Sequence, residues 1–313
     1  MALSLRRKWL FVGFFVFSIG CAATPTEIPP EGPARYHTKM GVAFLRQDNS
    51  RRAIDEFLKA IHLEPHYAEA HFNLGVAYWR QGMVNAALIE FEKTIDLDPC
   101  HAEAYYHMAM IYHVRGDFGK ATVFYRRAIG RNPDHARAHF NLALVHESEE
   151  NLVMAGAELK RAIDINPSFV EARNRLGLVL EKRGRFDDAI SEYLASVETD
   201  PGRSETYNLL GAACYKIGRY DDALSAWERA IEIRPAYPEA LFNMGLTYMK
   251  TGRLDEAIEA FKRSLELEPN FALAHFNLGR IYAMKDMKEE AAREFSLARQ
   301  IDPRIEIKTQ SEP

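Results

Sequence analysis

From residue 34 to residue 305, apolar and polar residues follow the period of an amphipathic α-helix. Apolar residues recur three and four positions apart in segments of about 14 residues, which places them on one side of a helix. A short break separates each segment from the next, and a proline follows every second segment. Because proline stops a helix, the pattern predicts pairs of short helices joined by turns, an all-α fold.

The helix pairs recur with a period of 34 residues. The prolines that mark this period are Pro65, Pro99, Pro133, Pro167, Pro201, Pro235, Pro269 and Pro303. The resulting repeats, numbered one to eight, are 34–67, 68–101, 102–135, 136–169, 170–203, 204–237, 238–271 and 272–305. Places within a repeat are numbered from 1 to 34, so each of these prolines stands at place 32. Chance would not put eight of the 14 prolines on one lattice, so the sequence predicts a stack of eight equivalent helix pairs.

Several other places carry one kind of residue in every repeat. Place 8 is always Gly or Ala, place 20 is always Ala, and place 24 is always large and apolar. Gly stands at place 15 in five repeats, where a left-handed residue ends a helix. These columns resemble the tetratricopeptide repeat over residues 34–305. The resemblance implies an α-solenoid of about eight helix-turn-helix repeats in a right-handed superhelix, with a concave groove lined by the first helix of each repeat.

Three places on the groove side of the first helix hold candidate binding residues. Place 5 is aromatic in five repeats, at Phe72, Tyr106, Phe140, Phe242 and Phe276. Place 6 is Asn in four repeats, at Asn73, Asn141, Asn243 and Asn277. Place 13 is basic in five repeats, at Arg46, Arg80, Lys182, Lys216 and Lys250.

Each of these places has a binding interpretation and a structural one. The aromatic residues form either a partner surface or a stripe that neighbouring helices cover. An Asn offers a donor and an acceptor to the backbone of an extended peptide, as in the asparagine ladder of O-GlcNAc transferase, but the ladder is interrupted here. The bases at place 13, with acids at place 2, complement the helix dipoles or form an acidic-ligand site.

The first 33 residues have a different character. Three bases, Arg6 to Lys8, precede an apolar run from Trp9 to Gly20, and a helix of that length spans only about 18 Å. Residues 1–20 therefore look like an export signal. The residues before Cys21 resemble a bacterial lipobox, which implies a lipid on Cys21; an ordinary cleaved signal is the alternative. Residues 21–33 are rich in proline and predict an extended tether.

This resemblance implies a place in the cell envelope. A lipidated Cys21 followed by Ala22 favours the outer membrane, with the repeats facing the periplasm. Without the lipid, the chain would be exported and soluble. Residues 306–313 form a short tail behind the last repeat.

Composition and motifs argue against catalysis. The chain has 40 Lys and Arg against 44 Asp and Glu, so a nucleic acid is not expected as the main partner. Three Cys are too few for a disulfide framework. No phosphate loop or His-Glu-x-x-His motif occurs, and we expect no catalytic residue, no cofactor and no metal.

The first functional hypothesis is therefore a non-enzymatic, lipid-anchored scaffold for protein–protein interaction. It would bind a protein or extended peptide in its groove and aid assembly of an envelope complex of the pilus or secretion type. Type IV pilus secretin pilotins are similar in plan, although they usually have about six repeats. The alternative is an adaptor that delivers an extended peptide or a glycan strand to an envelope enzyme.

Overall fold

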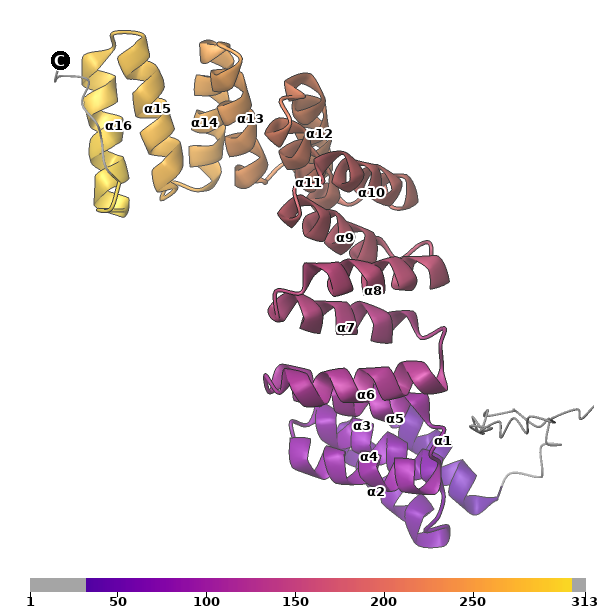
Figure 1. Cartoon of the computed structure of the whole chain (residues 1–313). Helices are drawn as coiled ribbons and strands as arrows, with labels where there is room; N and C mark the ends of the chain where they lie inside the picture. Colours follow the sequence, from indigo (N-terminus) through magenta and orange to yellow (C-terminus); the bar gives the residue numbers. More distant parts are fainter. Residues whose placement is uncertain (1–31, 306–313) are drawn as a thin grey trace, which may run out of the picture. The chain divides into compact units, whose positions relative to one another are not determined.

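The computed structural model describes residues 32–305, and in this range the chain is helical between short turns (Figure 1). The helices are α1 (Pro33–Arg46), α2 (Ser50–Leu63), α3 (Ala68–Arg80), α4 (Val84–Leu97), α5 (Ala102–Val114), α6 (Phe118–Arg131), α7 (Ala136–Ser148), α8 (Leu152–Ile165), α9 (Val170–Lys182), α10 (Phe186–Thr199), α11 (Ser204–Lys216), α12 (Tyr220–Ile233), α13 (Pro238–Lys250), α14 (Leu254–Leu267), α15 (Ala272–Met284) and α16 (Lys288–Ile301). Each sequence repeat holds one consecutive pair of helices, so the predicted all-α solenoid is confirmed.

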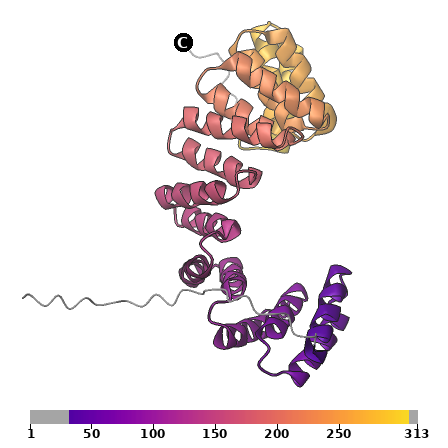
Figure 2. The ribbon, with the colours of Figure 1, turned by 90° about the vertical axis from the view of Figure 1, so that its right-hand side faces the viewer.

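The described residues fall into two parts that divide inside α5, after Met108. The N-terminal part holds α1 to α4 and the start of α5, and the C-terminal part holds the rest. Within each part, successive helix pairs lie side by side in chain order (Figure 2). The predicted signal peptide, Cys21 and the tail 306–313 lie outside the described residues. Across residues 32–305, no helix is both long enough and apolar enough to span a membrane.

In six of the eight repeats, the two helices are held at close range by a glycine facing a ring. A Cβ atom added to Gly177 would lie 2.3 Å from the Tyr193 ring, and one added to Gly245 would lie 2.6 Å from the Phe261 ring. These are places 8 and 24 of their repeats. Ala189, at place 20, and Tyr193 are both fully buried. The columns that define the repeat in sequence are therefore the contacts that build each helix pair.

The turn between the two helices always passes through the left-handed region. All eight residues at place 15 of the described repeats have φ between 56° and 80°. Five are Gly, as the sequence predicts, and the others are Asp48, Glu150 and Asp286. A side chain at such an angle is strained, and Asp tolerates it better than Glu because its short carboxylate can bond locally. The prediction that place 15 ends the first helix is confirmed.

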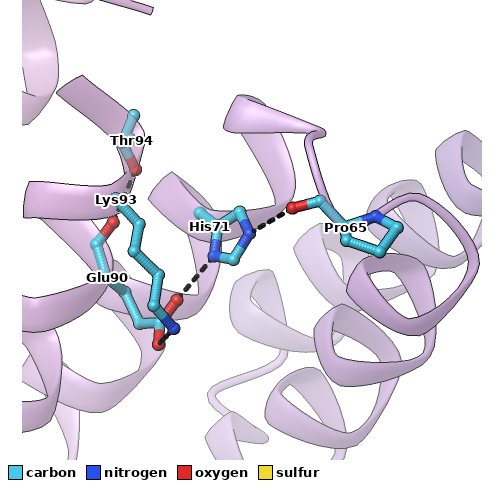
Figure 3. A network of polar contacts seen from close by, with 5 residues as sticks. All are labelled: Pro65, His71, Glu90, Lys93 and Thr94. Atoms are coloured by element: carbon cyan, nitrogen blue, oxygen red, sulfur yellow. Dashed lines mark hydrogen bonds and ion pairs between the residues drawn. The ribbon is translucent and has the colours of Figure 1, made fainter. Parts of the chain in front are cut away.

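In repeat two, a polar bridge at place 4 joins the helix pair to the loop before it (Figure 3). His71 Nδ1 lies 2.6 Å from Glu90 Oε2 on α4, and His71 Nε2 lies 3.0 Å from the Pro65 carbonyl oxygen of the preceding repeat. Lys93 binds the other oxygen of Glu90 at 2.9 Å. One buried ring thereby connects two helices and the inter-repeat proline.

The same bridge recurs along the chain. His139 and His275 make both contacts with the equivalent Glu and Pro residues. In repeat five the place is taken by Arg173, which donates to the Pro167 carbonyl at 3.2 Å and to Glu192 at 3.1 Å. Place 4 is therefore a position for a side chain whose nitrogens reach both the Glu carboxylate and the proline carbonyl. These histidines are structural, and no group of metal-ligand residues occurs within residues 32–305.

The close approach at place 8 predicts opposite effects for two Gly→Ala substitutions in the C-terminal part. Gly177→Ala places a methyl group against the buried Tyr193 ring and should lower the free energy of unfolding by about 1–3 kcal/mol. Gly156→Ala, at place 21 of repeat four, meets atoms only at 3.7 Å and should raise it by about 1 kcal/mol. Urea unfolding followed by circular dichroism measures both. Equal effects of the two substitutions would contradict the assigned role of place 8.

The bridge at place 4 predicts unequal couplings for two His–Glu pairs of the same length. Double-mutant cycles with Ala should give about 1–3 kcal/mol for His71 with Glu90, which are buried. The matched pair, His37 with Glu56, is also 2.6 Å long, but its ring is 26% exposed. Its coupling should stay below about 1 kcal/mol.

The His37–Glu56 pair should also respond to acid. Hydrogen bonds from His37 and then Lys59 hold the pKa of the Glu56 carboxyl below its ordinary value. A carboxylate with a lowered folded pKa stabilises the fold above the unfolded pKa, and this contribution is lost as the pH falls through the folded one. Glu56→Gln should therefore flatten the loss of stability between pH 6 and pH 3. In the double-mutant cycles, a larger coupling energy for His37 with Glu56 than for His71 with Glu90 would contradict the role given to burial.

Candidate functional site

The Asn residues at place 6 do not form one uniform row. Asn73 is 9% exposed, and its Nδ2 donates to the Glu69 carbonyl at 2.8 Å and to Glu69 Oε1 at 3.0 Å. Asn277 is 6% exposed and donates to the carbonyl of Leu273, one turn back, at 2.8 Å. Both amides are thus engaged by their own helices. Asn141 is half-buried on α7.

Asn243 differs from Asn73 and Asn277 because it reaches the neighbouring repeat. Its Nδ2 donates to Asn208 Oδ1 on α11 at 3.3 Å. The same oxygen accepts from Trp227 Nε1 at 3.0 Å. The Asn243 side chain therefore lies between α11 and α13. Its side-chain oxygen, Oδ1, is still able to accept a hydrogen bond.

The aromatic residues at place 5 are covered to a large extent by their own repeats. Tyr106 is 8% exposed, and Phe72, Phe140, Phe242 and Phe276 are half-buried. Phe242 packs on Phe261 at 5.5 Å and on Phe271 at 4.6 Å between ring centroids. Packing on the second helix and the following loop thus covers part of each ring, and the partner-surface interpretation of the column stays a prediction.

Most of the bases at place 13 bind the preceding first helix. Arg80 Nη1 donates to the Leu45 carbonyl at the end of α1 at 2.9 Å. Lys216 pairs with Glu181 at 2.7 Å, and Lys182 lies 3.5 Å from Glu147. Among residues 32–305, Lys250 makes no ion pair. These bases therefore link successive repeats, which favours the structural interpretation of the column.

One pocket opens in the groove of the C-terminal part, between α11 and α13. Its volume is about 230 Å³, and it is mostly apolar. The residues that line it are Ala212, Tyr215, Lys216, Trp227, Asn243 and Leu246. Repeat six has Asn208 and Ala212 at places 5 and 9, where repeat seven has Phe242 and Leu246. These smaller side chains leave the hollow over Trp227.

The repeat pattern identified Asn243 and Lys216 as candidates, but it did not single out Ala212, Tyr215 or Trp227. The signal that could have revealed this pocket is the departure of repeat six from the pattern at places 5 and 9. A repeat pattern identifies the residues that recur, whereas this hollow depends on a combination of residues that occurs in one repeat only.

A second, larger pocket lies in the groove of the N-terminal part, between α1 and α3. Its volume is about 560 Å³. The residues that line it are Arg35, Thr38, Lys39, Val42, Ala43, Arg46, Tyr67, Glu69 and Asn73. It holds three basic residues and one acid, in a chain that is acidic overall. Sequence analysis placed Arg46 and Asn73 on this side but did not connect them with Arg35 or Lys39.

The groups in and near these pockets are suited to binding. Cys214 is free and buried, and burial raises the pKa of its thiol, which disfavours the reactive thiolate. Burial also raises the pKa of Tyr67, which lines the N-terminal pocket, so its phenol stays protonated near neutral pH. Neither pocket holds a nucleophile with a neighbouring base.

Comparison with known proteins identifies the repeat. Family profiles described as tetratricopeptide repeat match residues 38–99, 102–135, 136–169, 155–204, 238–271 and 260–293, and a profile described as TPR repeat matches residues 211–252. No curated protein matches the chain in sequence.

Solved structures agree with the profiles. The crystal structure of YrrB, described as a TPR protein with an unusual peptide-binding site, is 27% identical and covers 59% of this chain and 95% of its own, with a TM-score of 0.52. MamA is 28% identical and covers 52% of this chain and 95% of its own, with a TM-score of 0.50.

The C-terminal part of a TPR repeat-containing protein from Cytophaga hutchinsonii shares only the fold. It is 16% identical and covers 76% of this chain and 97% of its own, with a TM-score of 0.65. The profiles, these structures and the eight helix pairs of the described residues agree: the chain belongs to the tetratricopeptide repeat family.

Proposed function

We propose that this protein is a non-catalytic scaffold that binds an extended polypeptide in the groove of its first helices. A lipid on Cys21 anchors it to the cell envelope, at the outer membrane and facing the periplasm, where it aids assembly of an envelope complex. The family and the peptide-binding site of the similar YrrB support a polypeptide partner. The resemblance of residues 18–21 to a lipobox supports the anchor.

The observation that carries the polypeptide proposal is the pocket between α11 and α13. It sets an apolar hollow, formed by Trp227, Ala212 and Leu246, beside the amide of Asn243. An extended peptide presents alternate side chains to one face and its backbone groups between them. One apolar side chain of the peptide can fill the hollow while a peptide N–H donates to Asn243 Oδ1.

The pocket predicts how two substitutions change peptide affinity. Peptides selected from a random decapeptide array are titrated against the fluorescence of Trp227 in a background in which Trp9 and Trp79 are both replaced by Phe. Asn243→Ala should weaken binding by about 2- to 10-fold, because one net hydrogen bond is lost. Ala212→Leu introduces the residue that repeat seven carries at place 9, so the fold should be kept. Because the added side chain fills the hollow, peptide affinity should fall.

The matched control is Asn277→Ala. Asn277 occupies the same place in repeat eight, but its amide is bonded within its own helix. This variant should bind peptide like the wild type. If Ala212→Leu also binds like the wild type and remains folded by circular dichroism, the hollow is not the peptide site.

The anchor is tested by labelling cells with radioactive palmitate. We expect label on the wild-type protein and none on Cys21→Ser, because the thioether to the lipid requires the Cys21 sulfur. Cys214→Ala, which changes a buried Cys in α11, is the control and should keep the label. Label that persists on Cys21→Ser would overturn the proposed anchor.

A further inference from the structure

The pocket of the N-terminal part has a row of basic residues along α1. Arg35, Lys39 and Arg46 stand at i, i+4 and i+11, within about 40° of one another around the helix. Val42 lies between them at i+7, and all four line the pocket. At 1.5 Å per residue, Arg35 and Arg46 are about 16 Å apart along the helix axis. The row is thus long and narrow, and it lies in a concave site.

The two ends of this row, Arg35 and Arg46, keep their charges free of ion pairs within the described residues. The one carboxylate of the pocket, Glu69, lies 3.5 Å from His101 Nε2 and accepts from Asn73 Nδ2 at 3.0 Å. The hydrogen bond from His101 is the main reason that the Glu69 pKa is lowered, so this group stays an anion committed to its neighbours.

Comparison with later repeats explains why Arg46 is different. In three of the four later repeats with a base at place 13, that base bonds to the first helix of the preceding repeat, as Arg80 does with the Leu45 carbonyl and Lys216 with Glu181; Lys250 is the exception. Among the described helices, none precedes α1. Arg46 therefore lines the pocket instead of linking two repeats.

We propose that this basic pocket binds an acidic segment of an extended polypeptide, with carboxylates on Arg35 and Arg46. The inference rests on the proposed function and specifies the charge of the partner segment. A single phosphate or carboxylate reaches only the donors within about 3 Å of it, so it cannot bridge a row of about 16 Å. An extended chain at about 3.3 Å per residue spans that row with five residues.

The shape and walls of the pocket favour the same occupant. Its volume of about 560 Å³ falls in the usual range of ligand sites. Val42, Ala43 and Tyr67 offer apolar surface to the aliphatic stems of Glu side chains. A flat lipid surface would reach the rim of such a concavity more easily than its lining.

The test uses the purified full chain in a mild non-ionic detergent and two fluorescein-labelled probes, octaglutamate and octaglutamine. Fluorescence anisotropy at 50 mM NaCl should give at least about tenfold tighter binding of octaglutamate. The affinity should fall at 200 mM NaCl, because salt screens exposed charges. The double variant Arg35→Gln, Arg46→Gln should lose about 3- to 10-fold in octaglutamate affinity.

The control is the double variant Arg51→Gln, Arg52→Gln. It removes the same charge from α2, outside the pocket, and should bind octaglutamate like the wild type. All four arginines are exposed, and circular dichroism checks that both variants fold. Equal losses in the two double variants, or equal binding of the two probes, would overturn the proposal.

Two further outcomes would reassign the site. Displacement of octaglutamate by 5 mM inorganic phosphate at constant ionic strength would make it a small-anion site. Binding to phosphatidylglycerol vesicles that depends on Arg35 and Arg46, without octaglutamate binding, would make it a lipid site. If octaglutamate fails while array-selected peptides still respond at Trp227, only this inference is wrong. If those peptides fail as well, the proposed function is wrong too.

Discussion

In six of the eight repeats a glycine at place 8 lies against a ring at place 24, and this contact sets the geometry on which the other contacts of the helix pair depend. In repeat five there is no room for even one methyl group between Gly177 and the Tyr193 ring. The second helix must therefore cross the first at one distance, with Ala189 as its small neighbour. With that crossing fixed, the groove side of the first helix is the part of the repeat left to vary.

Polar groups then connect one helix pair to the next. His71 and its equivalents bind the carbonyl of the preceding place 32, and bases such as Arg80 bind the end of the preceding first helix. These contacts recur because every internal repeat has a neighbour on each side. The free energy of folding is therefore approximately a sum of terms from the repeats and from their interfaces. They also use polar groups that would otherwise be candidates for binding a partner.

The sequence predicted the fold well because the fold is periodic. The 34-residue spacing, the left-handed turn at place 15 and the small residue at place 8 all appear where expected. Such positions obey local rules of helix ending and close packing, which the residue type alone reveals. Even Glu150, which replaces Gly at place 15, adopts φ of 59° because the adjoining helices impose it.

The candidate site was predicted less completely, for a physical reason. Whether an Asn at place 6 can bind a ligand depends on which acceptor its amide reaches, and that differs between Asn277 and Asn243. This difference follows neither from the residue type nor from the repeat place, because Asn277 and Asn243 share both. It follows from the neighbouring repeat, where Asn208 supplies an acceptor to Asn243.

Departures from the lattice therefore carry more information about binding than the lattice does. Ala212 in repeat six opens a hollow over Trp227, and Arg46 in repeat one has no preceding described helix to bind. In a stack of near-equivalent repeats, one exceptional residue alters only its own repeat and the adjacent interfaces. The array can thus tolerate a small residue or an unpaired charge at one point while its other interfaces hold the fold. An apolar hollow in one part and a basic row in the other are two separate exceptions, with different ligand chemistry.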